Sequence, residues 1–187
     1  NYGEDLWKSY SECKTLPAGN ISITCPLDPI SNSAYITCGT ASNPVNLCEH
    51  GGTGYPACRK PPYADCPYSP QLLNAIDVVA SNRLGADLPV YLPYVKGVSV
   101  GWGFVRNENL NPSWGWRQVY QADVDGQTII IELVHLSESG PPQQGPLFSG
   151  TQVGTTHRVA AHLHVGVVIN GTPVDPISDL SMCMGQR

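Results

Sequence analysis

The sequence predicts a mainly β protein, in which an antiparallel sheet folds around a groove and a disulfide-rich, loop-rich extension precedes it. Glycine (19 residues) and proline (17) are frequent in a chain of 187 residues, which is typical of short strands joined by turns. Two Asx-Gly pairs, Asp125-Gly126 and Asn170-Gly171, stand between β-rich runs and predict tight hairpins. No convincing amphipathic helix is present, so little helix is expected.

The cysteines predict a disulfide framework. Six of the seven lie between Cys13 and Cys66, and the seventh is Cys183. We therefore place a disulfide-stapled extension at residues 1–68 and a β domain at residues 69–187. Dense cysteines indicate an oxidising compartment, hence a secreted or extracellular protein, and their odd number leaves one thiol free or bonded to another chain. A zinc site is the weaker alternative, since no Cys-x-x-Cys pair is present. Its ligands would be Cys48, His50, Cys58 and Cys66.

Charge and composition argue against several classes of partner. The formal net charge is −5 and only 13% of residues are charged, whereas a nucleic-acid partner requires a basic stripe. No apolar run is long enough to span a bilayer. The chain begins at Asn1 without a methionine or a signal-like segment, which indicates a processed product. Two sequons, at Asn20 and Asn170, would suit a secreted glycoprotein.

The first strand signals lie in the extension, and the next is an apolar run that contains a carboxylate. In the extension, residues 21–24 and 34–37 alternate like short strands. Residues 72–80 are almost continuously apolar, and Asp77 interrupts them. Because a carboxylate is rarely buried without a partner, Asp77 either caps a turn or strand edge, or it serves as a ligand.

Further strand signals follow along the β domain. Residues 88–100 predict a strand, a turn at Lys96-Gly97 and a return strand. Residues 106–116 resemble a polar loop that contains two tryptophans. The next β-rich run forms the first Asx-Gly hairpin, and its second arm ends at His135.

The last strand signal contains two histidines, as His162-Leu163-His164, followed by a β-branched run. On a strand, residues i and i+2 point to the same face, so both imidazoles are expected to face one way and Leu163 the other. Two histidines on one face make half of a metal site or of an acid–base site.

Three segments in this order resemble the M23 family of zinc metallopeptidases, the LytM/lysostaphin-like peptidoglycan endopeptidases. The segment NAIDVVA, with the strand signals after it, is similar to the family's His-x-x-x-Asp segment and following strands. The segment DGQTIIIELVHLS is similar to its hairpin ending in His-Leu-Ser. The segments HLH and NGTPVDP are similar to its His-x-His strand and terminal turn. The resemblance covers the chain from about Gln71 onward.

The resemblance implies a role for each matched residue. The family places zinc on the aspartate of the first segment and on the second histidine of His-x-His, here Asp77 and His164. It uses the histidine of His-Leu-Ser and the first of His-x-His, here His135 and His162, to position and deprotonate the attacking water. The family's first zinc ligand stands four residues before the aspartate, and that position is Leu73 here.

Leu73 favours a degenerate member of the family, because leucine has no lone pair for a metal. Catalytic zinc generally has three protein ligands and an open water position, whereas Asp77 and His164 supply two. We therefore expect zinc to bind weakly or not at all, and we expect no other cofactor. His135 and His162 are then vestigial catalytic positions that belong to a hydrogen-bonded cluster with Asp77.

Three functions remain open from the sequence. The first is a secreted, non-catalytic binding or structural module, whose partner is a cell-wall peptide or an extracellular protein. The second is an active zinc endopeptidase that cleaves cell-wall peptides, with a substitute ligand such as His157 or His50. The third is a self-assembling subunit of an extracellular filament or sheath, which the odd cysteine, the Cys-rich extension and the low charge would suit.

Overall fold

The structure is mainly β and antiparallel, as the sequence predicts. Within the described residues it has ten strands and no helix, and every strand pair is antiparallel. This architecture is consistent with the M23 peptidase-like β fold that the resemblance implies. The computed structural model describes residues 21–40, 43, 45, 75–80, 85–140 and 145–184.

The strands are short at both ends of the described chain and long in the middle. Their bounds are β1 (Tyr35–Cys38), β2 (Ile76–Val79), β3 (Pro89–Tyr91), β4 (Gly101–Asn111), β5 (Gly115–Val124), β6 (Gln127–Leu136), β7 (Leu147–Phe148), β8 (Gln152–Thr155), β9 (Leu163–Ile169) and β10 (Thr172–Val174).

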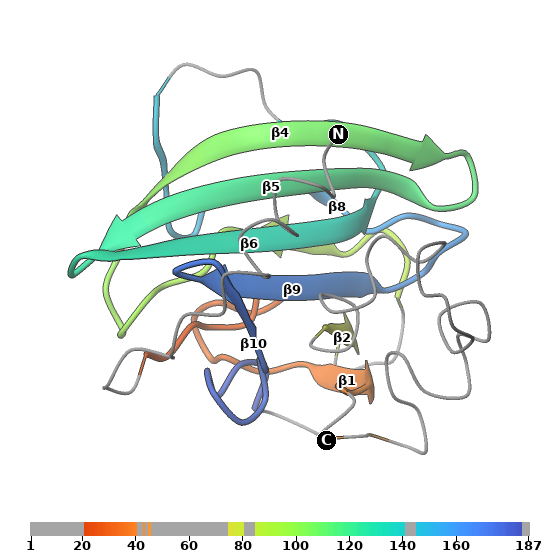
Figure 1. Cartoon of the computed structure of the whole chain (residues 1–187). Coiled ribbons are helices and arrows are strands. Elements are labelled where there is room, and N and C mark those ends of the chain that lie inside the picture. The colour runs from red at the N-terminus through yellow and green to blue at the C-terminus, as the bar shows by residue number, and fades with distance from the viewer. Residues whose placement is uncertain are drawn as a thin grey trace, which may run out of the picture.

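Eight of these strands form one sheet. Seven follow the order β1-β2-β9-β6-β5-β4-β7, and β10 pairs with β9 beside this path. Strands β4, β5, β6 and β9 lie side by side as long ribbons, with β2 and β1 beyond β9 (Figure 1). Strands β3 and β8 form a separate pair. Strand β9, which follows His162 and contains His164, therefore lies between the strands that carry Asp77 and His135.

The hydrophobic core packs against one face of the large sheet. Alternate residues of β5, β6 and β9 point to this face, as period-2 geometry requires. Trp102 is fully buried there, and its Nε1–H donates to the Pro93 carbonyl at 3.0 Å. The polar residues that alternate with the core side chains must then lie on the opposite face. Core residues of the three strands include Tyr120, Ala122, Ile129, Ile131, Leu133, Leu163, Val165 and Val167.

Both predicted Asx-Gly turns form. Asp125 and Gly126 have φ of 51° and 76° between β5 and β6, and Asn170 and Gly171 have φ of 50° and 80° between β9 and β10. Two successive left-handed residues match the right-handed twist of the flanking strands, which explains why Asx-Gly is favoured at these positions.

The prediction of a polar loop at residues 106–116 is wrong. These residues form the end of β4, a short turn and the start of β5, and Glu108 lies opposite Arg117 across the two strands. Polar side chains are compatible with these strands because they pair across the ladder, and the Arg117 Nη1 lies 2.9 Å from the Glu108 Oε2.

The prediction of a return strand directly after Lys96-Gly97 is also wrong. The turn forms, with φ of 51° and 71°, but Val95 and Val98 make an isolated bridge rather than a hairpin. The preceding strand, β3, pairs with β8 instead. The chain after the turn enters β4 at Gly101 and pairs with β5.

Part of the predicted extension joins the large sheet. Strand β1 pairs with β2, and Ala34 and Ile36 are buried in the common core. A disulfide links Cys25 to Cys183, and Cys38 is disulfide-bonded as well. The other four cysteines lie outside the described residues, and the domain boundary at residues 68 and 69 stays a prediction.

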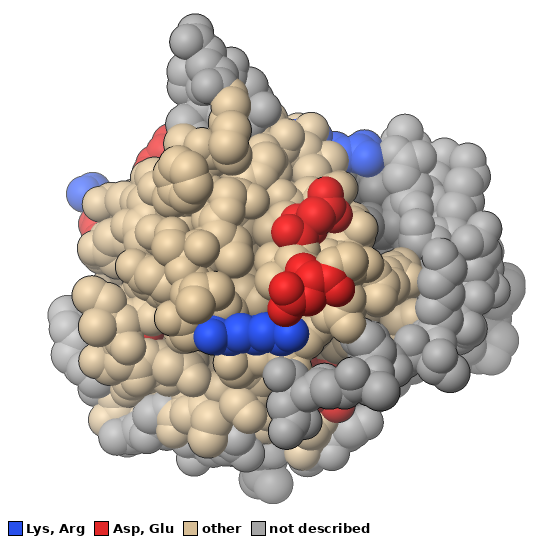
Figure 2. Space-filling view, turned by 90° about the vertical axis from the view of Figure 1, so that its left-hand side faces the viewer, with Lys and Arg blue, Asp and Glu red and all other residues tan. Residues whose placement is uncertain are grey.

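The surface carries few charges. Most of the face shown in Figure 2 is uncharged, and acidic side chains gather beside a basic one. Exposed ion pairs join Lys96 to Asp125 at 2.8 Å and Arg158 to Asp87 at 3.0 Å. In the part of the chain that the structure describes, no helix could cross a membrane.

Replacing Gly126 by alanine tests the left-handed turn. An added Cβ would meet no atom within 4 Å, so the cost comes from the φ of 76° alone, and we expect a loss of about 1 kcal/mol in the free energy of unfolding. Urea unfolding measures this loss. Gly103→Ala is the control, because its Cβ would meet only the Gln121 carbonyl at 3.7 Å, and we expect no loss. Equal losses of unfolding free energy in both variants would contradict the left-handed conformation of Gly126.

Candidate functional site

The structure brings Asp77, His135, His162 and His164 together on one face of the sheet. Asp77 in β2 lies directly opposite His164 in β9, and His164 lies opposite Val134 in β6. Residues that face each other across a ladder share a face, so these three side chains lie in one row. Leu163 points into the core, as expected of the residue between the two histidines. The catalytic and metal-binding roles of the four residues stay predictions.

One oxygen of Asp77 contacts two imidazoles. The Asp77 Oδ1 lies 3.1 Å from the His164 Nδ1 and 3.6 Å from the His162 Nε2. An ionised carboxylate only accepts hydrogen bonds, so the His164 Nδ1–H is the donor, whereas the longer contact to His162 is electrostatic. Asp77 and His164 are both 8% exposed, while the His162 side chain is 31% exposed. His162 is therefore the most exposed of these three residues.

A β-bulge turns His135 toward the other histidines. Trp116 pairs with Leu136 and Arg117 pairs with Val134, so His135 is an extra residue in β6 without an opposite partner. Its φ of 69° is left-handed, which is uncommon for a residue with a side chain. Strict alternation would point His135 into the core. Instead its ring centre lies 4.6 Å from that of His162, and bulges often re-aim side chains in this way.

The carbonyl of Trp114 fixes the orientation of His135. This oxygen lies 2.8 Å from the His135 Nδ1, so the ring donates through Nδ1–H and keeps a lone pair on Nε2. Burial lowers the pKa of His135 from 6.5 to about 4, opposed by the Trp114 hydrogen bond and assisted by charge on His164 and His162. His135 is therefore a neutral hydrogen-bond acceptor at pH 7.

The turn that carries Trp114 is itself fixed by hydrogen bonds. The Asn111 Oδ1 accepts from the backbone N–H of Ser113 at 2.8 Å and of Trp114 at 2.9 Å. Gly115 follows with a φ of 74°, and a Cβ there would collide with the Leu136 carbonyl. The indole of Trp114 remains 56% exposed beside His135, with ring centres 6.1 Å apart. The site therefore has an aromatic group at its border.

His157 organises the neighbouring loop. Its Nδ1 accepts from the backbone N–H of Val159 at 3.1 Å and of Ala160 at 3.3 Å, and the backbone N–H of His157 donates to the His135 carbonyl at 2.8 Å. Because Nδ1 accepts these two hydrogen bonds, the proton of the neutral ring is on Nε2. The one lone pair that could bind a metal is therefore already in use. His50, the other residue considered as a substitute ligand, lies outside the described residues.

A buried ionic group that the sequence patterns did not predict lies on the same face. The Arg117 side chain contacts the Glu108 Oε2 at 2.9 Å and the Glu132 Oε1 at 3.5 Å. Arg117 and Glu132 are 6% and 3% exposed. The available signal was Glu132, a charged residue inside the second arm of the predicted hairpin, since such charges are rarely buried without a partner. Arg117 lies opposite Val134, which places this group next to the histidines.

The donor atoms of the described residues do not complete a catalytic zinc site. Asp77 and His164 supply one oxygen and one nitrogen, whereas catalytic zinc needs three protein donors. Among the residues that the structure describes, no group of three or more His, Cys, Asp or Glu side chains is placed to hold a metal ion. Leu73 lies outside those residues, but its side chain offers no donor atom in any conformation.

Comparisons with known proteins give distant structural similarity. No family model and no curated protein matches the sequence. A zinc-containing peptidase from Vibrio cholerae is 20% identical over 57% of this chain and 30% of that chain, with a TM-score of 0.42. Csd3 from Helicobacter pylori is 15% identical over 86% of this chain and 35% of that chain, with a TM-score of 0.44. A chain of the SpoIIIAH–SpoIIQ complex is 15% identical over 83% of this chain and 98% of that chain, with a TM-score of 0.47. Similarity at this level assigns neither a family nor an activity.

A pH titration tests the environment of His135. We expect its imidazole NMR signals to titrate near pH 4 rather than near 6.5. Because the folded-state pKa is the lower one, protonation favours the unfolded state. The stabilising contribution of neutral His135 is complete above pH 6.5 and is lost as the pH falls toward 4.

The matched variant is His135→Asn, since asparagine tolerates a positive φ and can donate to the Trp114 carbonyl. It should flatten the decline in the free energy of unfolding between pH 6.5 and 4. A midpoint for His135 near 6.5 in the wild type would contradict the lowered pKa of this partly buried imidazole.

Proposed function

We propose that this chain is a secreted M23 peptidase-like module that has lost its catalytic zinc and acts by binding or by structural assembly. The observation that carries the proposal is Leu73, which stands where the family has its first zinc ligand. The other matched residues, Asp77, His135, His162 and His164, are present and lie together.

The contact between Asp77 and His164 supports this proposal. A buried carboxylate is costly unless a metal, a charge or hydrogen bonds compensate it. The His164 Nδ1–H at 3.1 Å and the His162 ring at 3.6 Å provide such compensation from the chain itself. The carboxylate therefore has partners within the chain, as buried polar groups generally have.

The exposed border of the site suits a ligand without strong charge. Trp114 offers a large aromatic surface, and Trp is enriched among residues that dominate binding energy. His135 is neutral at pH 7 and offers a hydrogen bond rather than a fixed charge, and the His162 side chain is partly exposed beside it. A cell-wall peptide or an extracellular protein would meet these requirements.

The disulfides support a location outside the cell. Cys25, Cys38 and Cys183 are all disulfide-bonded, which indicates an oxidising compartment. The sequon at Asn170 lies in the turn between β9 and β10, and glycosylation there is part of the proposal.

Restoring the missing ligand tests the proposal. We expect the wild type to lose zinc on dialysis, and Leu73→His to bind zinc at least about 10–100-fold more tightly, since even outer-shell changes alter metal affinity by that factor. Zinc content by elemental analysis and a chelator competition measure the difference. The control is Leu73→His combined with His164→Ala, which should bind no better than the wild type. A wild type that retains stoichiometric zinc and cleaves cell-wall peptides would instead establish the endopeptidase.

Peptide titration tests the binding face. We expect pentaglycine, a glycine-rich cell-wall type of peptide, to shift the NMR signals of His135, His162 and Trp114 without being cleaved. Trp114→Ala should weaken this binding by about tenfold or more, as loss of an aromatic anchor does. Phe148→Ala is the matched control, because Phe148 is 61% exposed at the opposite end of β4. Equal effects of the two substitutions would exclude Trp114 as an anchor.

A further inference from the structure

We propose that residues 25–40, here called the supporting segment, position Asp77 for its contacts with the histidines. In this arrangement β1 pairs with β2, and residues 175–183 form hydrogen bonds and a disulfide with the chain on both sides of β1. This support does not depend on whether the site binds a metal, a peptide or a protein.

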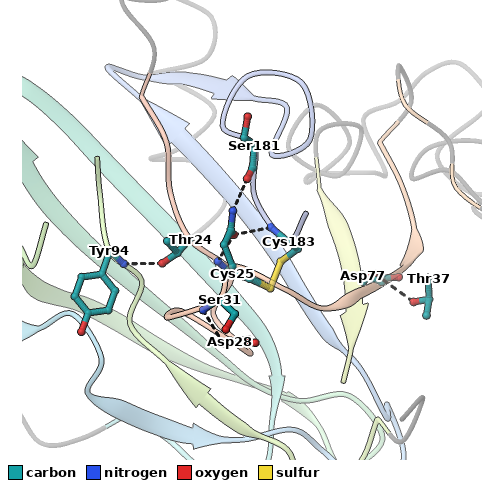
Figure 3. The surroundings of a disulfide bond; sticks show 10 residues. Thr24, Cys25, Asp28, Ser31, Thr37, Asp77, Tyr94, Ser181 and Cys183 are labelled. Carbon is teal, nitrogen blue, oxygen red and sulfur yellow. Dashed lines mark hydrogen bonds between the residues drawn. A yellow bond between two sulfur atoms is a disulfide. The ribbon is translucent and has the colours of Figure 1, made fainter. Parts of the chain in front are cut away.

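Strand β2 depends on a neighbour to stay in the sheet. It has four residues and pairs with β9 on one side and with β1 on the other. Without β1 it would be a short edge strand, and such strands open locally at low cost. Cys38 in β1 lies directly opposite Asp77, and the Thr37 Oγ1–H donates to the Asp77 carbonyl at 3.3 Å (Figure 3). The supporting segment thus reaches Asp77 itself.

The first end of β1 is attached through a disulfide and an asparagine. The bond between Cys25 and Cys183 joins residues 158 positions apart, and both cysteines are fully buried. The Asn32 Oδ1 accepts from the N–H of Cys25 at 2.8 Å and of Cys183 at 2.9 Å, and its Nδ2–H donates to the Ser181 carbonyl at 2.8 Å. Figure 3 shows the disulfide between Cys25 and Cys183, with Ser181 nearby. Strand β1 begins three residues after Asn32, at Tyr35.

The other end of β1 is attached through Asp175. This carboxylate is 5% exposed, and its Oδ2 accepts from the Thr40 hydroxyl and from the Asn43 Nδ2–H at 2.8 Å. Its Oδ1 accepts from the N–H of Ile177 at 2.8 Å, so the charge is compensated by several donors. Thr40 stands two residues after β1, and Asp175 directly follows β10.

These attachments restrict the motion of β1 and therefore of β2. Opening of β1 would break the Asn32 contacts at one end or the Asp175 contacts at the other. Each hydrogen bond that must break raises the free energy of local opening, most of all for bonds to a charged group. Asp77 then stays within hydrogen-bond distance of His164.

Asn32→Gly tests the inference, because glycine accepts the φ of 50° and only the three side-chain hydrogen bonds are lost. We expect the backbone amides of β2 to exchange with deuterium on the order of tenfold faster, since one to two hydrogen bonds correspond to that factor. The amides of Tyr120 and Ile131, in the centre of the sheet, should keep their rates. The imidazole NMR signals of His164 and His162 should shift.

The matched control is Asn170→Gly. Asn170 has the same φ of 50°, and its Oδ1 accepts from the Thr128 N–H at 3.0 Å at the far end of β9. It should leave β2 exchange unchanged. Asn32→Asp, which retains the two acceptor contacts and loses the donor, should give an intermediate effect even if Asn32→Gly does not fold.

Unchanged exchange in β2 in both Asn32 variants would overturn the inference. Acceleration of Tyr120 and Ile131 by the same factor as β2 would also overturn it, because the contacts would then stabilise the whole fold without positioning Asp77. The measurement involves neither zinc nor peptide, so its failure leaves the proposed function untouched.

Discussion

The shared oxygen of Asp77 is the contact on which the site depends. A buried carboxylate costs several kcal/mol if it is left unpaired, on the order of the whole stability of a small domain. Here His164 at 3.1 Å and His162 at 3.6 Å offset that cost. The contact requires the observed register between β2 and β9, because a slip of one residue would turn Asp77 to the core face. The site can therefore form only in this register of β2 and β9.

Several irregular features around the site bring its side chains together or keep them in place. His135 reaches the other histidines through a bulge with a φ of 69°, a conformation that a residue with a side chain adopts at some cost. The Trp114 carbonyl holds the ring once it is there. On the other side, residues 25–40 keep β2 from being an edge strand. Regular sheet geometry alone would place His135 in the core, so these local departures bring the groups together.

Local rules predicted much of the fold. The Asx-Gly turns at residues 125–126 and 170–171 form, because two successive left-handed positions are a property of those residues alone. The shared face of Asp77 and His164 also follows from regular strands. The polar run at 106–116 was misread because the charges of Glu108 and Arg117 are paired only after the strands meet. The bulge at His135 and the buried Arg117 group are products of tertiary pairing, so no periodicity in the sequence indicates them.

Because Leu73 offers no ligand atom, we propose that Asp77 and the three histidines hold no zinc ion and that the chain itself compensates the Asp77 carboxylate. X-ray diffraction from crystals grown with zinc, with data collected on both sides of the zinc absorption edge, tests this claim most directly. The account predicts no anomalous peak between Asp77 and His164, with the carboxylate hydrogen bonded to the imidazole. A strong peak there, within bonding distance of three protein atoms, would contradict it.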